Sequence, residues 1–86
     1  MIQKIDCPVS VSFAFDHIKR RVYPKWLLWE GRLHAVDKVG FHHTYREGRV
    51  LHHVFSVVTK TLFFRLILNT ETLHWRLKEI SDGLPD

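Results

Sequence analysis

Apolar and polar residues alternate along most of the chain, and this alternation is its dominant pattern. In the first segment the apolar members of the alternation are Val9, Val11, Phe13 and Phe15. A period of two is typical of a β-strand that buries one face, whereas a helix would repeat its apolar positions every three or four residues. We therefore expect strands along the chain, with helix the weaker interpretation everywhere.

Four dipeptides mark the turns between the expected strands: Glu30-Gly31, Glu47-Gly48, Thr59-Lys60 and Thr70-Glu71. Glycine readily adopts the positive φ of tight hairpin loops, so the first two are the stronger candidates. Two-residue loops fix the register, because positions that flank a loop pair outward in order. The predicted pairs include Trp29–Arg32, Leu27–His34, Tyr45–Val50, His43–His52, His42–His53, Phe55–Phe64, Val57–Leu62, Leu68–Leu73, Leu66–Trp75 and Phe64–Leu77.

This register gathers large apolar residues on one face and so predicts the core. The predicted core residues are Leu27, Trp29, Leu51, Phe55, Val57, Leu62, Phe64, Leu66, Leu68, Leu73, Trp75 and Leu77. The register also places Gly40 opposite Phe55. Carried through the strand expected over residues 32–45, it would bury Lys38 unless a bulge or corner lies between Val36 and Gly40. Short strands joined by tight hairpins predict an all-β fold, a small antiparallel barrel or strongly coiled sheet of five to six strands. We expect one domain over residues 1–86 with a short acidic tail at 81–86.

Two segments resemble an uncharacterised bacterial family of small β-rich proteins. The first segment matches the family pattern at Pro24, Leu27, Trp29, Gly31, Arg32, His34, Val36 and Val39, and the second at Phe64, Leu66, Trp75, Leu77, Ile80 and Asp82. The family prefers an aromatic residue at the position of Leu27 and a tyrosine at that of His34. The resemblance covers roughly residues 24–82. It implies an all-β fold and supplies no catalytic residues, because the family carries no established activity. Some members are encoded near error-prone DNA polymerases, which hints at a nucleic-acid context.

Cysteine content and the lack of chemical motifs narrow the class of protein. The 86 residues include one cysteine, Cys7, so neither an intramolecular disulfide nor a cysteine zinc cage can form within the chain. No segment has the apolar run of a signal peptide or a membrane span, so we expect a soluble cytoplasmic protein without a membrane partner. Serines and acids stand in no nucleophile, phosphate-loop or paired-carboxylate motif. We therefore expect a binding protein that is not an enzyme and needs no cofactor.

Positive charge is concentrated between His17 and Trp26, although the net charge of the chain is only +4. This acid-free segment contains Lys19, Arg20, Arg21, Tyr23, Lys25 and Trp26. Because cations bind phosphates and aromatic rings stack on bases, it predicts a nucleic-acid-binding surface with little sequence preference. Trp26 and Leu28 are expected to point away from the core, and the hairpin-end residues Arg32, Arg46 and Arg49 would extend the surface. The alternative is an edge strand whose cations prevent aggregation.

A second apolar face predicts self-association or a protein partner. Outside the assigned core the register gathers Val39, Phe41, Tyr45, Val50, Val54, Phe63 and Ile67. An exposed patch of this kind calls for a partner or a homodimer. The predicted interface residues are Phe41, Tyr45, Val54 and Phe63.

Histidine is abundant, with seven residues that include the doublets His42-His43 and His52-His53. If His43 pairs with His52 across neighbouring strands, the two imidazoles can ligate one metal ion, with His74 as a third ligand. A metal-binding protein is therefore a second alternative function. The remaining alternatives are a pH switch and ordinary half-buried strand positions.

Overall fold

The computed structural model describes residues 1–83, and these form seven β-strands. The strands are β1 (Ile2–Asp16), β2 (Arg21–Trp29), β3 (Arg32–Ala35), β4 (Lys38–Glu47), β5 (Val50–Val58), β6 (Phe63–Asn69) and β7 (Trp75–Ser81). The all-β prediction is confirmed, but the expected five to six strands are seven, because the strand expected over residues 32–45 is broken at Val36 and Asp37. Among the described residues no helix has the length and apolar character to cross a membrane. Residues 84–86 of the predicted acidic tail lie outside the described residues.

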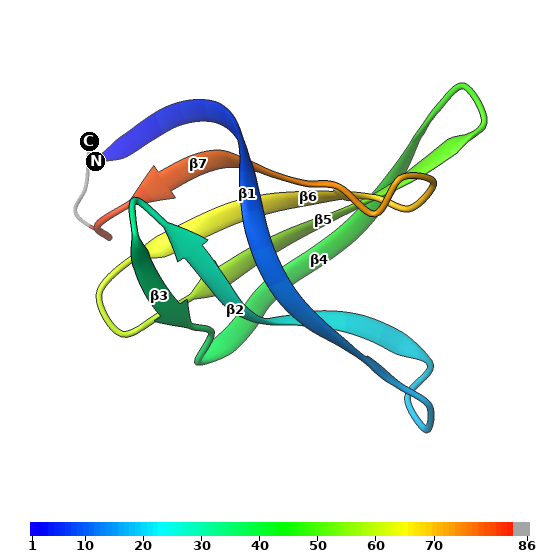
Figure 1. The fold of residues 1–86 in the computed structure, drawn as a ribbon, viewed down its shortest axis with the longest axis horizontal. Coiled ribbons are helices and arrows are strands. Elements are labelled where there is room, and N and C mark those ends of the chain that lie inside the picture. The colour runs from blue at the N-terminus through cyan, green and yellow to red at the C-terminus, as the bar shows by residue number, and fades with distance from the viewer. Residues whose placement is uncertain (84–86) are drawn as a thin grey trace.

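The seven strands form one curled antiparallel sheet in the order β3-β2-β1-β7-β6-β5-β4 (Figure 1). Its two edge strands, β3 and β4, are consecutive in the chain. The N–H of Val36 donates to the carbonyl of Lys25 on β2 at 2.9 Å, and the N–H of Asp37 donates to the carbonyl of Val58 on β5 at 2.8 Å. The fold is therefore a half-barrel whose edges are joined at this one corner.

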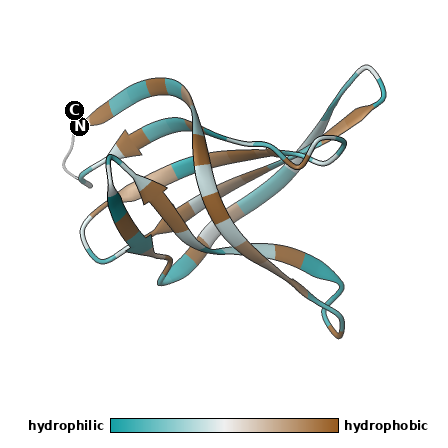
Figure 2. Ribbon diagram, viewed as in Figure 1, coloured by the Kyte–Doolittle hydropathy of each residue, from teal (hydrophilic) through white to brown (hydrophobic). Residues whose placement is uncertain are grey.

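The core lies on the inner face of the sheet. Along β6 its buried residues Phe64, Leu66 and Leu68 alternate with more exposed ones, and hydrophobic segments recur along the strands (Figure 2). Its buried members are Leu27, Phe55, Val57, Phe64, Leu66, Leu68, Trp75 and Leu77. All eight were predicted to face the core, while the predicted members Trp29, Leu51 and Leu62 are only half-buried. Leu73 is an error in the predicted core: its side chain is 58% exposed, because it lies in the loop before β7 with a φ of 63°.

The first hairpin has the predicted register, but the next three do not. Trp29 pairs with Arg32 across a Glu30-Gly31 loop in which both residues have positive φ, 51° and 74°. Next to the later loops the true partner lies two positions beyond the predicted one: Tyr45 pairs with His52, Phe55 with Leu66 and Leu68 with Trp75. Beyond the bulge between Arg65 and Leu66 the error is three positions, because Phe64 pairs with Ile80. A shift of two preserves the alternation of faces, so the core prediction was largely correct despite the wrong register.

Side-chain hydrogen bonds account for the longer loops. Thr59 Oγ1 donates to the carbonyl of Leu62 at 3.1 Å and accepts from its N–H at 3.2 Å, which closes a four-residue loop. Asn69 Oδ1 accepts the N–H groups of Glu71 and Thr72 at 2.9 and 3.2 Å. Such local bonds compete with a two-residue turn, and composition alone does not reveal which will form.

Bulges interrupt four of the strand pairings within the described residues, and two of them bear on the sequence predictions. The pairing of β4 with β5 shifts between Val39 and Phe41, which confirms the expected irregularity before Gly40. Gly40 does not lie opposite Phe55, however, because Phe55 pairs with His42. The pairing of β1 with β2 shifts between Ser12 and Phe13, and beyond it the side chain of Phe15 is exposed. The buried alternation expected for the first strand therefore ends near Val11.

Two hairpins extend away from the curled part of the sheet (Figure 1). One consists of residues 13–24 of β1, β2 and the turn between them, and is called the β1–β2 arm below. The other is the β4–β5 hairpin, which turns at Gly48 and Arg49. The β1–β2 arm carries most of the residues predicted to bind nucleic acid.

Candidate nucleic-acid interface

The half-barrel is open along one line, between the free edges of β2 and β4. β3 pairs with β2 only from Trp26 to Trp29, and β4 is the last strand of the sheet. From the corner at Val36 and Asp37 onward, no strand within the described residues fills the space between the two edges. This opening is called the seam groove.

Two depressions that share Tyr23 and Val39 make up the seam groove. The corner depression has a volume of about 350 Å³, and the arm depression has a volume of about 330 Å³. The corner depression is lined by Tyr23, Pro24, Lys25, Trp26, Ala35, Val36, Asp37, Lys38 and Val39. The arm depression is lined by Asp16, Lys19, Arg21, Val22, Tyr23, Val39, His42 and Phe55. Cationic and aromatic side chains therefore border the groove on both sides.

Most of the predicted nucleic-acid-binding residues line this groove, namely Lys19, Arg21, Tyr23, Lys25 and Trp26. Arg20 lies in the exposed turn of the arm. Strand pairing puts Arg21, Tyr23 and Trp26 on one face of the ribbon, because they pair with Asp16, Ala14 and Ser12. Trp26 is 42% exposed and, like Leu28, points away from the core as expected.

The opposite side of the groove is formed by β4, and the sequence did not predict that β4 lies beside the basic segment. Lys38 lines the corner depression and His42 lines the arm depression. These residues face β2 only because the chain crosses from one sheet edge to the other at Val36 and Asp37. No local pattern in the sequence reports that crossing.

Asp16 is an acid in the arm depression, and its carboxylate is used in the turn. Its Oδ1 accepts the N–H of Ile18 at 2.9 Å and the N–H of Lys19 at 3.1 Å. The Lys19 hydrogen bond is the main reason that the pKa of Asp16 lies below its ordinary value. The ionised carboxylate thus fixes the shape of the arm's tip.

His42 joins the groove to the core. Its ring stacks on Phe55 with centroids 4.3 Å apart, and its Nε2 lies 2.7 Å from Nδ1 of His53. Burial lowers the pKa of His42, and the nearby charges of His53 and Arg21 lower it further. The neutral ring is therefore favoured, and it gives the groove a flat aromatic wall.

The hairpin-end arginines do not form one surface with the seam groove. Arg32 begins β3 at the Glu30-Gly31 turn, at the opposite end of β2 from the arm's tip (Figure 1). Arg46 and Arg49 lie at the end of the β4–β5 hairpin, away from the β1–β2 turn (Figure 1). None of the three is among the lining residues of the seam groove.

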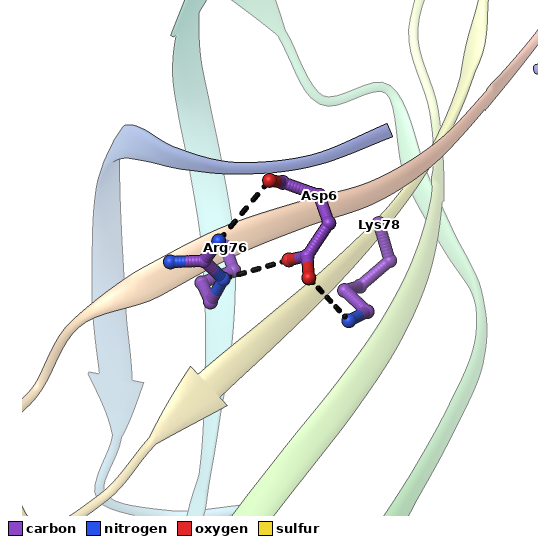
Figure 3. A network of polar contacts seen from close by, with 3 residues as sticks. All are labelled: Asp6, Arg76 and Lys78. Atoms are coloured by element: carbon purple, nitrogen blue, oxygen red, sulfur yellow. Dashed lines mark hydrogen bonds and ion pairs between the residues drawn. The ribbon is translucent and has the colours of Figure 1, made fainter. Parts of the chain in front are cut away.

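Arg76 and Lys78 on β7 differ from the cations in the groove because the carboxylate of Asp6 already holds both of them. Arg76 Nε donates to Asp6 Oδ1 at 2.7 Å, and Lys78 Nζ lies 3.3 Å from Asp6 Oδ2 (Figure 3). These two partners, Arg76 first, lower the pKa of Asp6. Within residues 1–83 no ion pair involves Lys19, Arg21, Lys25 or Lys38. The cations that line the groove are therefore more available to an anionic ligand than Arg76 and Lys78, which are paired with Asp6.

The four predicted interface residues are not equally available. Phe41, Tyr45 and Phe63 are exposed, but Val54 is buried, with only 4% of its surface accessible. Phe41 and Tyr45 lie on the free edge strand β4, with Phe41 near His43 and Tyr45 stacked on His52. Any interface on this face would therefore centre on β4.

The predicted histidine pairing is wrong in register. His43 lies opposite Val54, and His52 lies opposite Tyr45. Among the described residues no group of three His, Cys, Asp or Glu side chains is placed to hold a metal ion. His43, His52 and His74 therefore do not assemble a three-ligand site within the described part of the chain.

No protein-family model, curated protein or solved structure matches this chain. The resemblance to a bacterial β-rich family therefore stays a prediction from the sequence.

Proposed function

We propose that this chain is a non-enzymatic binding module for single-stranded nucleic acid, with the strand lying along the seam groove. The observation that carries the proposal is the meeting of cations from two separate segments. Lys19, Arg21 and Lys25 border the groove on one side and Lys38 on the other. Phosphate oxygens are the natural partners of such a cluster.

Aromatic side chains favour a single strand over a duplex. Trp26 is half-exposed beside Lys25, and Tyr23 lies where the two depressions meet. An aromatic ring stacks on any unpaired base and contributes about 1–3 kcal/mol per base, whereas the bases of a duplex are already stacked on one another. The unpaired backbone edges of β2 and β4 add hydrogen-bonding groups that bases can use. Little sequence preference is expected, because stacking does not distinguish the bases.

Fluorescence anisotropy with a labelled oligothymidylate tests this function. Trp26→Ala should weaken binding about tenfold, the loss expected for one stacked base. Leu28→Ala is the matched control, because Leu28 is equally exposed on the same strand but has no ring, and it should bind within twofold of wild type. Arg20→Glu combined with Arg21→Glu should abolish binding. Equal affinity in all four proteins, or no binding by wild type at about 50 mM salt, contradicts the proposal.

Self-association is the second candidate, and the exposure of Phe41 favours it. This ring is 60% exposed on the free edge strand β4. An unpaired edge with an apolar ring can add a strand from a second molecule. Lys38, Arg46 and the bulge at Gly40 oppose such pairing, so this candidate ranks second.

A further inference from the structure

The tip of the β1–β2 arm carries an apolar side chain that the fold does not use. Ile18 is 89% exposed, more than any other large apolar residue of the described chain. Phe15, near the same turn, is also largely exposed. Lys19 and Arg20 follow Ile18 directly. The tip therefore presents one exposed aliphatic side chain beside two cationic side chains.

The turn that presents Ile18 is held in a fixed shape. Asp16 Oδ1 accepts the N–H groups of Ile18 and Lys19 at 2.9 and 3.1 Å. Arg20 completes the turn with a φ of 53° before Arg21 pairs with Asp16. A shaped turn places a side chain more reproducibly than a loop without internal bonds.

We infer that the tip docks where a single strand becomes a duplex, with Ile18 packed against the terminal base pair. This inference rests on the proposed function, because it concerns the same nucleic acid as it leaves the seam groove. Isoleucine is among the apolar side chains that insert against base-pair faces in duplex DNA. Lys19 and Arg20 would contact the phosphates on either side of that base pair.

The seam groove leads directly to the tip of the arm, which favours a junction between single strand and duplex as the ligand. Lys19 lines the arm depression and also belongs to the turn. A strand lying in the groove therefore reaches Ile18 as it passes the end of the arm. Insertion inside a duplex would require unstacking and bending, whereas the terminal base pair already exposes its apolar face.

Binding to three nucleic-acid ligands tests this inference: a labelled single strand, a blunt duplex, and a fork in which the same single strand extends from that duplex. Wild type should bind the fork about tenfold more tightly than the single strand. Ile18→Ser should remove this preference while binding the single strand within twofold of wild type. Leu73→Ser is the matched control, because Leu73 is an exposed apolar residue in a different loop, and it should keep the preference. A 2-aminopurine in the terminal base pair should change its fluorescence with wild type and not with Ile18→Ser.

The outcomes distinguish the two proposals. Equal binding of fork and single strand by wild type, or an undiminished preference in Ile18→Ser, overturns the inference and leaves single-strand binding in place. Failure of wild type to bind any of the three ligands overturns both. Sedimentation with vesicles of phosphatidylserine and phosphatidylcholine tests whether the tip binds an anionic membrane instead of a nucleic acid. Binding that Ile18→Ser abolishes, without any fork preference in wild type, would assign the tip to a membrane surface and overturn the inference.

Discussion

His42 and His53 form a stacked, hydrogen-bonded pair, with Nε2 of His42 2.7 Å from Nδ1 of His53 and ring centroids 4.9 Å apart. They are diagonal neighbours, because His42 lies opposite Phe55 and His53 opposite Thr44. One of the two nitrogens donates the hydrogen and the other accepts it, so both rings can be neutral. Two imidazolium ions here would repel each other at close range.

This pair predicts a loss of stability in mildly acidic solution. Burial lowers the pKa of both His42 and His53 below the ordinary value of 6.5. The unfolded chain therefore binds protons at a higher pH than the folded chain, and the free energy of unfolding falls as the pH drops from about 6.5 toward the lowered pKa values. Denaturant unfolding at about pH 7.5 and pH 5.5 measures the difference. His42→Phe should reduce it, and Phe41→Leu, a neutral change on the same strand, should preserve it.

Asp6 and Asp16 act in a different pH window. Their pKa values lie below the ordinary 3.8, so what they contribute to stability is present above that value and is lost only as the pH falls through the lower folded pKa. They do not disturb a comparison between pH 7.5 and 5.5. Equal stability of wild type at those two values, or a full wild-type difference in His42→Phe, would contradict the assignment to the histidine pair.

Adjacent phenylalanines on β6 predict a sharp contrast in stability. Phe64 is buried in the core, whereas the neighbouring Phe63 faces outward and is exposed. Phe64→Ala should lower the free energy of unfolding by about 3–5 kcal/mol, which is comparable to the whole stability of many small domains. Phe63→Ala should cost below about 1 kcal/mol. Urea unfolding followed by circular dichroism measures both, and similar losses in the two variants would show that the assigned faces of β6 are wrong.

Self-association can be tested apart from folding because Phe41 and Val54 differ in burial. Phe41→Lys should leave the fold intact, and it should yield a monomer if β4 forms an interface. Val54→Lys would place a charge at a buried position and should instead destabilise the fold by several kcal/mol. Analytical ultracentrifugation decides the point. A wild type that is already monomeric at high micromolar concentration excludes the β4 interface.

The alternation of apolar and polar residues predicted the face of the sheet on which each residue lies better than it predicted which residues pair across neighbouring strands. Phe55, Leu66 and Trp75 are core residues as predicted, since the register error next to each of the later loops was two positions. The β4–β5 turn has two residues, as expected, but it lies one position later, at Gly48 and Arg49. In the β5–β6 and β6–β7 loops the errors arose because Thr59 and Asn69 bond to the backbone and lengthen the turn. Those bonds depend on geometry that composition does not encode.

The candidate site was only half predictable for a similar reason. The side of the seam groove that β2 forms is contiguous in sequence, and its cations and aromatic rings stand out as a cluster. The side that β4 forms, with Lys38 and His42, comes from another segment. It meets β2 only through the curl of a seven-stranded sheet and the corner at Val36. Long-range closure of this kind is a property of the whole fold.

Lys38 offers a test of the groove that is independent of the basic segment, because it was identified from the structure alone. If the strand lies in the seam groove, Lys38 contacts a phosphate, and binding releases one condensed counterion at that contact. The slope of log affinity against log salt concentration should then fall in magnitude by about 0.7 in Lys38→Gln, the value for one phosphate of a single strand. Lys4→Gln is the matched control, because Lys4 is an exposed lysine on β1 that lines a depression on another part of the surface. Affinity for an oligothymidylate should be measured at several salt concentrations between about 50 and 200 mM, the range over which such slopes are steep. Lys38→Gln should flatten the line and Lys4→Gln should reproduce wild type, whereas an equal effect of the two substitutions would place the strand outside the groove.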